Sequence, residues 1–298
     1  MRIAVFTKNF TNPAYGAARL GAERAAAQFG AEVMHLVPKK GDDPEEQSAL
    51  IDQALALIPR PDAFVLSPVH VSKVDPAIQR IAAAAIPMVG LINPIQAAPS
   101  VAYVGSDDYQ LGLGLAHYLF RYLQGRGQVL IFTGPEESFT SRERLRGFRE
   151  AARQHPNIAI AGVLAGDYAG ETARERAAQW LRTKPQLDAC LVANDIMAIG
   201  VLDALDSAGR TAAVVGVNAI PQAIEAIAND RMLATADFNA MQMAYLATEC
   251  AARSLRGEIV PATIELPVQI VDRSNCQYWN RPYAQRSVIT LEQLRQQA

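Results

Sequence analysis

The stretch AFVLSPVHVSKVDPAIQRIAAAAIPMVGL, residues 63–91, decides the fold. It begins with the apolar run Ala63–Leu66, ends with the apolar run Met88–Leu91, and has helical spacing over Pro76–Ala85. Both runs are continuously apolar, which is typical of parallel strands covered on both faces. The stretch is therefore a strand–helix–strand unit, and repeats of such a unit predict a doubly wound α/β sheet.

The same alternation extends to both sides of this stretch. In the first part of the chain it predicts strands at Ile3–Phe6, Glu32–Val37 and Ala102–Val104, with helices at Ala14–Phe29 and Glu45–Leu57. It then restarts, with strands at Val129–Phe132, Ala159–Leu164, Ala189–Val192, Ala213–Val217 and Leu233–Ala236. The helices expected there are Leu111–Leu123, Arg142–Gln154, Thr172–Arg182, Met197–Ala208 and Pro221–Asn229.

The end of the chain continues the pattern for a short distance. A long helix is expected over Gln242–Leu255, followed by strands at Thr263–Leu266 and Val268–Val271, and the tail from about Asn275 is polar and aromatic without a clear period. The two α/β halves are too long together for one sheet, and no Gly/Ser/Pro-rich linker joins them. Two lobes connected by short crossings that can hinge are therefore expected.

Composition excludes several classes of function. The chain has 298 residues, 50% of them hydrophobic, and a formal net charge of −2. A nucleic-acid partner is not expected, because such a surface needs a basic excess to neutralise phosphates. No apolar stretch reaches the roughly 18 residues of a membrane helix. Met1-Arg2 leads straight into a strand, so no secretory leader is visible.

The three cysteines, Cys190, Cys250 and Cys276, allow at most one disulfide. The favoured interpretation is that they are small buried hydrophobic residues. A Cys250–Cys276 bridge remains an alternative.

Motifs for catalysis or for a cofactor are missing. Gly112-x-Gly114 lies inside a helical pattern and lacks the third glycine of a dinucleotide site. Gly16 and Gly21 are not followed by the Lys-Ser/Thr of a phosphate-binding loop. Asp107-Asp108 could be a metal or acid–base pair, but a helix start is the better interpretation. Neither an enzyme nor a cofactor is expected.

The four histidines have no metal-ligand spacing, and no metal is expected. His70 is the one histidine kept as a candidate, because it follows the Ala63–Leu66 strand. Doubly wound sheets bind ligands beyond the carboxyl ends of their strands.

Polar and aromatic residues gather at those strand ends, and rings and amides there suit a ring-shaped polar ligand. For Asn12, Asn194 and Asn218, a helix cap is an equally weighted alternative. The residues following the strands include Asn9–Tyr15, Ile92-Asn93-Pro94, Thr140–Arg144, Asp167-Tyr168, Asn194-Asp195, Asn218 and Asp237-Phe238.

The chain resembles the ribose/galactose-type periplasmic binding proteins, whose lobes also occur in lactose-repressor-type regulators. The resemblance covers roughly residues 2–272. It rests on an ordered series of short motifs: Thr11-Asn12-Pro13, Ile86-Pro87-Met88-Val89, Val104-Gly105-Ser106-Asp107-Asp108, Arg142-Glu143-Arg144 with Gly147-Phe148, Ala193-Asn194-Asp195 with Met197-Ala198 and Gly200, and Val214-Val215-Gly216.

The resemblance implies a type I periplasmic-binding fold, with two parallel-sheet lobes joined by a three-stranded hinge. An N-terminal lobe of residues 1–106 plus 239–267 is then expected, with a C-terminal lobe of 107–238 plus 268–282 and a tail of 283–298. The resemblance implies that the chain is the solute-binding receptor of an ABC-type importer and closes on a small uncharged polar ligand such as a sugar. A monomer in the periplasm is expected, with a transporter permease as partner and the leader absent from this chain.

The resemblance also implies which residues contact the ligand. They are Asn12, Tyr15, Ile92, Asn93, Arg142, Tyr168, Asn194, Asn218 and Phe238, with Phe10 and His70 as further candidates.

The chain departs from the ribose-type pattern at several of these positions. That pattern has Asp-Arg in place of Ile92-Asn93, Asp in place of Asn218, Gln in place of Phe238, and an aromatic residue in place of Ala14. Carboxylates that grip neighbouring hydroxyls are thereby replaced with amides and apolar groups, which favours a less hydroxylated ligand than ribose. A modified sugar, a polyol or a flat polar ring fits this interpretation.

Two other functions remain open on the sequence. The chain could be the ligand-sensing domain of a transcriptional regulator or of a sensor receptor, although it begins with a strand and has no helix-turn-helix before it. An enzyme on the same fold would need a nucleophile–base pair or a cofactor motif, and neither is recognisable.

Overall fold

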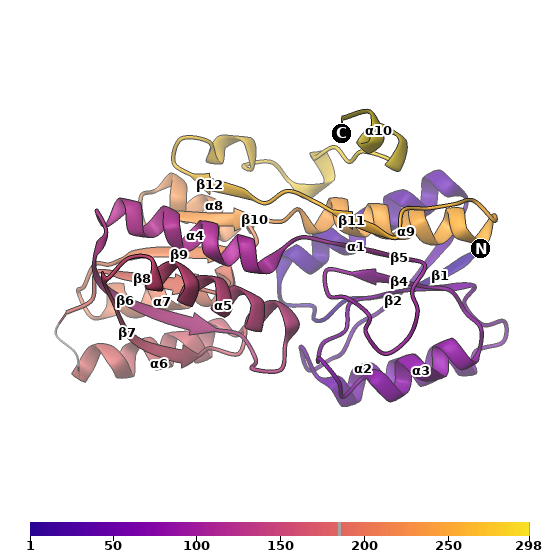
Figure 1. Ribbon diagram of the computed structural model, residues 1–298, viewed down its shortest axis with the longest axis horizontal. Coiled ribbons are helices and arrows are strands. Elements are labelled where there is room, and N and C mark those ends of the chain that lie inside the picture. The colour runs from indigo at the N-terminus through magenta and orange to yellow at the C-terminus, as the bar shows by residue number, and fades with distance from the viewer. Residues whose placement is uncertain (184–185, 298) are drawn as a thin grey trace. The chain divides into compact units, whose positions relative to one another are not determined.

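Two compact units make up the chain in the computed structural model, which describes residues 1–183 and 186–297. Unit 1 comprises residues 1–106, 239–267 and 281–298, and unit 2 comprises residues 107–238 and 268–280. Each unit has its own six-stranded sheet with helices packed on it (Figure 1). The prediction of two doubly wound α/β lobes is confirmed.

In unit 1 the strands run in the order β11-β5-β4-β3-β1-β2, and all neighbours are parallel. The strands are β1 (Arg2–Phe6), β2 (Glu32–Leu36), β3 (Ala63–Leu66), β4 (Met88–Leu91), β5 (Ala102–Gly105) and β11 (Thr263–Glu265). The helices are α1 (Pro13–Phe29), α2 (Pro44–Ala56), α3 (Asp75–Ala83), α9 (Ala240–Leu255) and α10 (Leu291–Gln297), with a 3-10 turn, η2, at Tyr283–Gln285.

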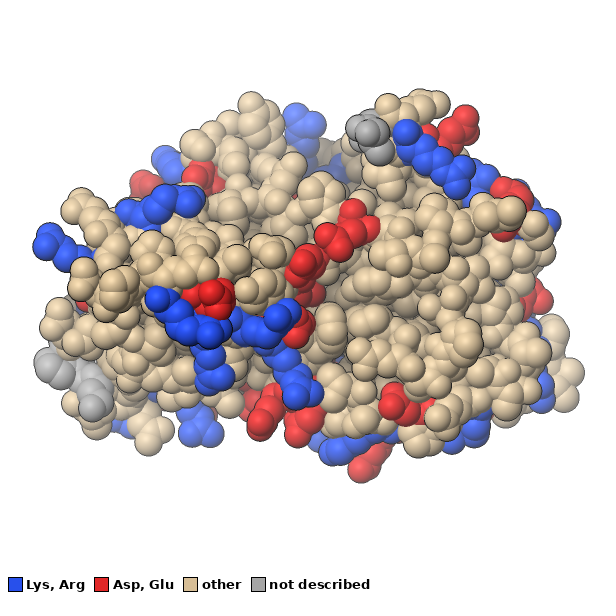
Figure 2. Space-filling view, viewed as in Figure 1, with Lys and Arg blue, Asp and Glu red and all other residues tan. Residues whose placement is uncertain are grey.

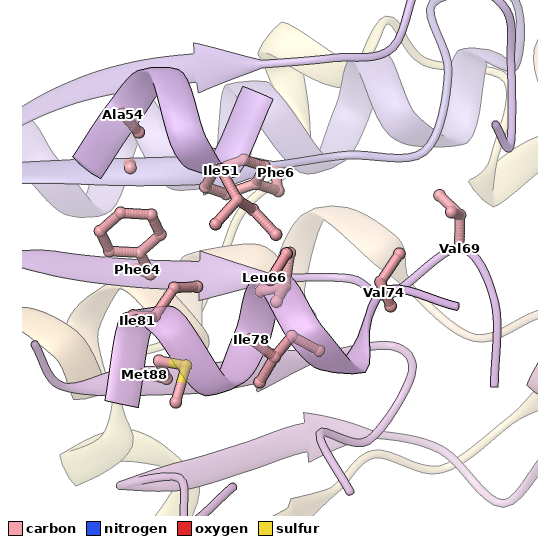
Figure 3. Packing of buried hydrophobic residues seen from close by; sticks show 12 residues of the cluster. Phe6, Ile51, Ala54, Phe64, Leu66, Val69, Val74, Ile78, Ile81 and Met88 are labelled. Atoms are coloured by element: carbon pink, nitrogen blue, oxygen red, sulfur yellow. The ribbon is translucent and has the colours of Figure 1, made fainter. Parts of the chain in front are cut away.

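The core of unit 1 follows from the continuously apolar strands. Alternate residues point to opposite faces of a strand, so Phe6, Phe64 and Leu66 meet Ile51 of α2 and Ile78 of α3 on one face of the sheet (Figure 3). Helices α1 and α9 pack together and cover the other face (Figure 1). With both faces covered, the strand ends are where polar side chains can gather.

Unit 2 has the strand order β12-β10-β9-β8-β6-β7. The strands are β6 (Arg126–Thr133), β7 (Asn157–Ala165), β8 (Ala189–Val192), β9 (Ala213–Val217), β10 (Ala234–Asp237) and β12 (Gln269–Asp272). The helices are α4 (Asp108–Tyr122), α5 (Phe139–Arg153), α6 (Gly170–Thr183), α7 (Asp195–Ser207) and α8 (Pro221–Ala228), with a 3-10 turn, η1, at Cys276–Tyr278.

Two features of unit 2 and of the tail differ from expectation. Strand β12 pairs antiparallel with β10 at the edge of an otherwise parallel sheet. Such an edge strand needs no crossover helix, so periodicity alone does not reveal its direction.

The tail, expected as a separate segment over residues 283–298, belongs to unit 1 from residue 281 and contains η2 and α10. The chain therefore passes between the units after residues 106, 238, 267 and 280, once more than the three-stranded hinge implies.

The cysteines are free thiols, so the Cys250–Cys276 alternative is not realised. Burial raises the pKa of the Cys190 and Cys250 thiols to about 12, as expected of small residues inside a hydrophobic core.

Surface charges are mixed in sign. Exposed arginines of α5 and α6 pair with acidic residues three positions earlier, as in Arg146–Glu143 and Arg174–Glu171, and blue and red side chains accordingly lie side by side in Figure 2. Of the helices that the structure describes, none combines the length and apolar character that crossing a membrane requires.

Candidate functional site

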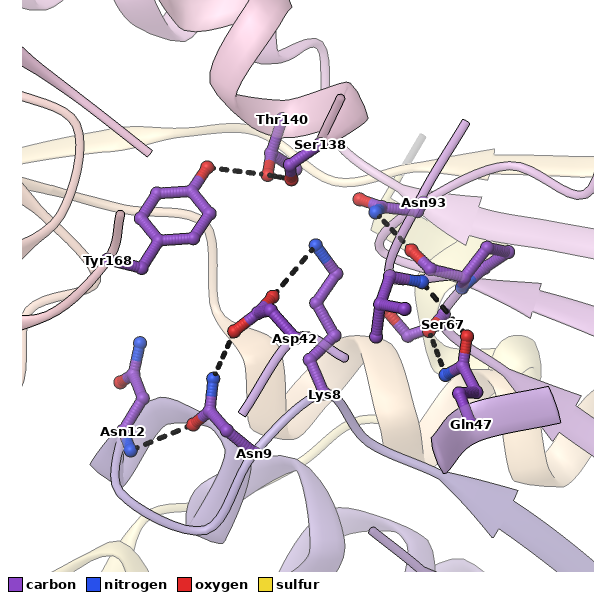
Figure 4. Close-up of polar contacts among 12 residues, drawn as sticks. Lys8, Asn9, Asn12, Asp42, Gln47, Ser67, Asn93, Ser138, Thr140 and Tyr168 are labelled. Atoms are coloured by element: carbon purple, nitrogen blue, oxygen red, sulfur yellow. Dashed lines mark hydrogen bonds and ion pairs between the residues drawn. The ribbon is translucent and has the colours of Figure 1, made fainter. Parts of the chain in front are cut away.

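Buried polar side chains gather beyond the carboxyl ends of β1, β3 and β4 in unit 1 (Figure 4). We call this group the unit 1 cluster, and it consists of Lys8, Asn9, Asn12, Asp42, Ser67 and Asn93. Burying so many polar groups costs free energy unless each finds a partner. Their local contacts therefore show which groups are already engaged and which remain available.

Lys8 and Asp42 are the charged pair of the unit 1 cluster. Lys8 follows β1 and is 1% exposed, and its Nζ lies 3.7 Å from Asp42 Oδ1, with the Asp42 side chain 9% exposed. Asn9 Nδ2 donates to the other carboxylate oxygen of Asp42 over 2.9 Å. The backbone N–H of Asp42 donates to the Lys8 carbonyl, which joins the two loops.

Asn12 caps the helix that follows the cluster. Its side-chain oxygen accepts from Ala14 N over 3.0 Å, and its own N–H donates to Asn9 Oδ1. Because the oxygen is used by the cap, the Asn12 amide nitrogen is the atom that can face a ligand. Tyr15, in the first turn of α1, is 9% exposed. Phe10 is 61% exposed and lies over the guanidinium of Arg19, at 5.0 Å.

Asn93 is held by its amide nitrogen, which donates to the Pro68 carbonyl over 2.6 Å. Within the described part of the chain its Oδ1, like Ser67 Oγ, is buried without a hydrogen-bond partner. Ile92 is 3% exposed and has a φ of 62°, a left-handed conformation that β-branched residues rarely adopt. His70 is half-buried, and its Nδ1 accepts from the N–H groups of Ser72 and Lys73, so it serves the turn after β3.

Unit 2 has a corresponding group beyond the carboxyl ends of its strands. We call it the unit 2 cluster, and it consists of Ser138, Thr140, Tyr168, Asn194, Asn218 and Phe238. The Tyr168 hydroxyl lies 2.9 Å from Thr140 Oγ1, which in turn lies 3.3 Å from Ser138 Oγ (Figure 4). Because a hydroxyl both donates and accepts, these three hydroxyl groups can reorient their hydrogens to suit a ligand.

Tyr168 and Asn194 are fixed by the loops that carry them. Tyr168 has a φ of 59°, and its ring lies so close to Gly134 that a Cβ at that glycine would come within 2.3 Å of it. Asn194 is the N-cap of α7: its Oδ1 accepts from Met197 N over 2.9 Å, and its Nδ2 donates to the Tyr168 carbonyl over 3.4 Å. The cap interpretation of Asn194 is confirmed, as is that of Asn12.

Two arginines of α5 have different environments. Arg144 is 3% exposed, donates to Asp108 and to the Ala193 carbonyl over 2.7 Å each, and lies 5.5 Å from the centre of the Phe238 ring. Arg142, the residue expected to contact the ligand, is exposed in the first turn of the same helix. Arg144 therefore holds the site loops together, while the Arg142 guanidinium is accessible.

Asn218 is not a cap. It has a φ of 122° and is 9% exposed, and within the described residues its buried Oδ1 has no hydrogen-bond partner. Asp195 fixes its loop by accepting from Ile220 N over 3.0 Å and from the Thr235 hydroxyl over 2.7 Å. Complete burial raises the pKa of Asp195 to about 7, although both hydrogen bonds act to lower it.

The remaining histidines contact neighbouring side chains. His35 Nε2 lies 3.0 Å from Glu23, and His117 Nδ1 lies 3.1 Å from His155 Nε2. The residues that the structure describes include no group of His, Cys, Asp or Glu side chains that could hold a metal ion. Asp107 caps α4 and Asp108 pairs with Arg144, so the helix-start interpretation is confirmed.

The sequence-based expectations missed Lys8, Asp42, Ser67 and Ser138. A cation two residues after the apolar strand that ends at Phe6 was a signal for Lys8. Asp42 had none, because the turn Gly41-Asp42-Asp43-Pro44 indicates only a helix start.

The sequence of these two α/β units matches a known family. Residues 3–259 match the model of the periplasmic binding protein domain. The chain belongs to this family. Among its curated relatives is the D-ribose/D-allose-binding protein of Pseudomonas aeruginosa, 28% identical over 91% of this chain and 88% of the relative. The ribose import binding protein of Bacillus subtilis is 24% identical over 90% of this chain and 86% of the relative.

A solved structure of a relative adds a bound ligand. The periplasmic solute-binding protein of an ABC transporter from Actinobacillus succinogenes, with bound D-allose, is 26% identical to this chain. It has a TM-score of 0.85 and covers 93% of this chain and 99% of its own. The resemblance to ribose/galactose-type binding proteins is therefore confirmed, and the relatives of this chain are sugar-binding proteins.

Proposed function

We propose that this chain is the solute-binding receptor of an ABC-type importer and that it closes on one small uncharged polar molecule, a sugar or sugar-like polyol. Family membership supports the receptor role, and the names of the relatives support the ligand class. Such a receptor performs no bond chemistry, so it is not an enzyme.

The observation that carries this proposal is a set of buried acceptors that lack partners. Asn93 Oδ1 and Ser67 Oγ in unit 1, and Asn218 Oδ1 in unit 2, are buried without a hydrogen bond among the described residues. Leaving such a group unpaired costs about 1–3 kcal/mol. Ligand hydroxyls donating to these oxygens would recover that free energy.

The mechanism follows from linkage. A ligand that contacts residues of both units binds the closed form more tightly and shifts the population toward it. A transporter permease that recognises only the closed form would then receive loaded receptor. The receptor would act as a monomer in the periplasm, with no nucleic-acid partner.

We assign ligand contact to the residues implied by the resemblance, together with Lys8 and Asp42. The assigned set is Asn12, Tyr15, Ile92, Asn93, Arg142, Tyr168, Asn194, Asn218 and Phe238, with Phe10 at the rim and His70 in support of the turn after β3.

A titration against defined ligands tests the proposal. Isothermal calorimetry with D-ribose, D-allose, D-galactose, xylitol and myo-inositol should yield at least one saturable, one-to-one binding curve. The same ligand should raise the unfolding temperature and be recovered unchanged, as judged by NMR. Conversion of the ligand to a product would contradict a receptor without chemistry.

Arg142 offers the first variant to test. Arg142→Ala should weaken binding of that ligand at least about tenfold, the equivalent of 1.4 kcal/mol, because charge-assisted hydrogen bonds are among the stronger ones. The apo protein should unfold as the wild type does, since Arg142 is exposed. Arg149→Ala, an exposed arginine of the same helix, is the matched control. Equal affinity in both variants would remove Arg142 from the site.

A further inference from the structure

A buried lysine after β1 and a largely buried aspartate after β2 restore charge to a site whose other polar groups are mostly amides and hydroxyls. Lys8 is 1% exposed and the Asp42 side chain 9% exposed. Burying two charges is expensive, and attraction between them compensates only when their geometry is good. Several surface pairs on this chain, such as Lys40–Asp43 at 2.9 Å, are shorter than this one.

The separation within the pair is its informative feature. Lys8 Nζ and Asp42 Oδ1 are 3.7 Å apart, close enough for attraction but beyond a direct hydrogen bond, which for charged groups is about 2.7–2.9 Å. Asp42 Oδ1 is accordingly buried without a hydrogen-bond partner in the described part of the chain, whereas Oδ2 is engaged by Asn9. One carboxylate oxygen is thus left for a third group.

The chemistry of that third group is restricted by the pair. It must donate to Asp42 Oδ1 and can accept from Lys8 Nζ, and a hydroxyl is the common group that does both through one atom. A ligand carboxylate would be repelled by Asp42, and a ligand ammonium by Lys8. The pair itself is neutral overall, which suits an uncharged ligand.

We propose that Lys8 and Asp42 together bind one hydroxyl of the ligand and thereby select a neutral polyhydroxylated molecule over its acidic and amino derivatives. This inference rests on the proposed function. It also revises the expectation of a less hydroxylated ligand, because the charged residues missing after β4 and β9 are replaced here by a charged pair after β1 and β2. The site is therefore suited to a hydroxyl-rich ligand.

The fold is already arranged to hold the pair. Asp42 has a φ of 58°, where Asn and Asp are the best tolerated residues after glycine, and its N–H is bonded to the Lys8 carbonyl. Asparagine can therefore replace Asp42 without a change in backbone conformation, and methionine can fill the space of the Lys8 stem.

The experiment compares wild type, Asp42→Asn, and the double variant Lys8→Met/Asp42→Asn. Binding of D-ribose, D-allose and D-galactose would be measured by calorimetry, with D-ribonate and D-galactosamine as charged probes. We expect the double variant to bind the best neutral sugar at least about 100-fold more weakly than wild type, since a site built to pair a hydroxyl depends strongly on that pairing. Lys39→Met, at an exposed lysine, should bind as wild type does.

The outcomes separate the two proposals. A wild type that binds no neutral sugar or polyol contradicts the proposed function. A wild type that binds one, with equal affinity in the double variant, overturns only the role of Lys8 and Asp42. Tighter binding of D-ribonate than of D-ribose by the wild type would show that Lys8 binds an anion and would overturn the selection of a neutral ligand. Should the double variant fail to fold, Asp42→Asn alone is the deciding variant, and unchanged affinity there overturns the proposal.

Discussion

At the scale of single residues, the polar groups of the two clusters divide into those that build loops and those with an atom left over. Asn12 and Asn194 each use their oxygen in a helix cap. Asn93 and Asn218 keep a buried oxygen without a partner within the described chain. The same residue type thus serves structure at two positions and is available to a ligand at the other two.

Asp195 is one of the residues that build loops, and its protonation makes the unfolding free energy depend on pH. The unfolded chain releases this proton near its ordinary pKa of about 4, whereas burial holds the folded pKa at about 7. The folded state therefore binds more protons across this window, so the contribution of Asp195 to the unfolding free energy decreases as pH rises from about 4 to about 7.

Asp195→Asn removes this titration. Urea unfolding at pH 5 and pH 7.5 should show the wild type losing stability relative to the variant as pH rises. At pH 5 the variant should be less stable than the wild type by about 1–3 kcal/mol, because its amide cannot accept from both Ile220 N–H and the Thr235 hydroxyl. This deficit should shrink at pH 7.5, where the wild type has lost the contribution of the protonated carboxyl. A stability difference that does not change with pH would contradict the raised pKa.

At the scale of elements, close approach between helices decides the position of the site loops. Helices α4 and α5 meet backbone to backbone: a Cβ on Gly112 would come within 2.5 Å of the Arg144 carbonyl, and one on Gly147 within 2.3 Å of the Tyr109 carbonyl. This contact places Arg144 against Asp108 and Phe238. Helix packing thus explains Gly112 of the Gly112-x-Gly114 sequence, which lies inside a helix as its pattern indicated.

The two glycines of α4 give opposite predictions. Gly112→Ala should destabilise unit 2 by about 1–3 kcal/mol through overpacking. Gly114→Ala should stabilise it by about 0.5–1 kcal/mol, since a Cβ there would meet no neighbouring atom of the described residues within 4 Å and alanine favours the helix. Chemical denaturation of both variants checks this, and a loss of stability in both would show that contact with α5 does not distinguish the two positions.

Most elements were predictable because their signal is local. Apolar runs such as Ala63–Leu66 and Ala189–Val192 appear as β3 and β8 with the expected bounds. Helix α5 begins at Phe139, three residues before the expected Arg142. The sequence did not reveal this start, because Ser138 at the N-cap makes no side-chain capping hydrogen bond. Helix α10 was missed because long-range contacts determine it, through Leu291 N–H donating to Glu249 and Gln242 bonding twice to Ile289.

For the candidate site, the sequence identified the loops better than the atoms. Residues after strand ends could be named because parallel sheets always present them at one edge. The pairing of Lys8 with Asp42 depends on how the β1 and β2 loops meet, which is a tertiary property. Whether Asn218 caps a helix was likewise undecided until its left-handed backbone was known.

At the scale of the whole molecule, the tail differs from the expectation of a separate segment, because it belongs to unit 1. It contacts unit 2 through Trp279, whose Nε1 donates to Asp237 over 2.7 Å, and then crosses to unit 1. There Leu291 is 3% exposed, and Glu249, which accepts from its N–H, is fully buried. The tail is therefore part of the core of unit 1 rather than a loose end.

Shortening the Leu291 side chain tests this role. Leu291→Ala should lower the unfolding free energy by about 2–4 kcal/mol, as expected for a buried leucine. Glu292→Ala, at an exposed neighbour, should change it by about 0.5 kcal/mol or less. Calorimetric unfolding of both variants gives the comparison, and equal midpoints would mean that the tail adds nothing to unit 1.

Because the chain crosses an even number of times, strand β1 at its start and helix α10 near its end belong to the same unit. Fluorescent proteins fused near these two elements would both be attached to unit 1. Energy transfer between them would therefore not report a hinge motion between the units. A biosensor made from this chain would instead need one dye at an end and the other on unit 2, for example at the exposed Ala208. The three native thiols are buried, so an introduced cysteine there could be labelled selectively.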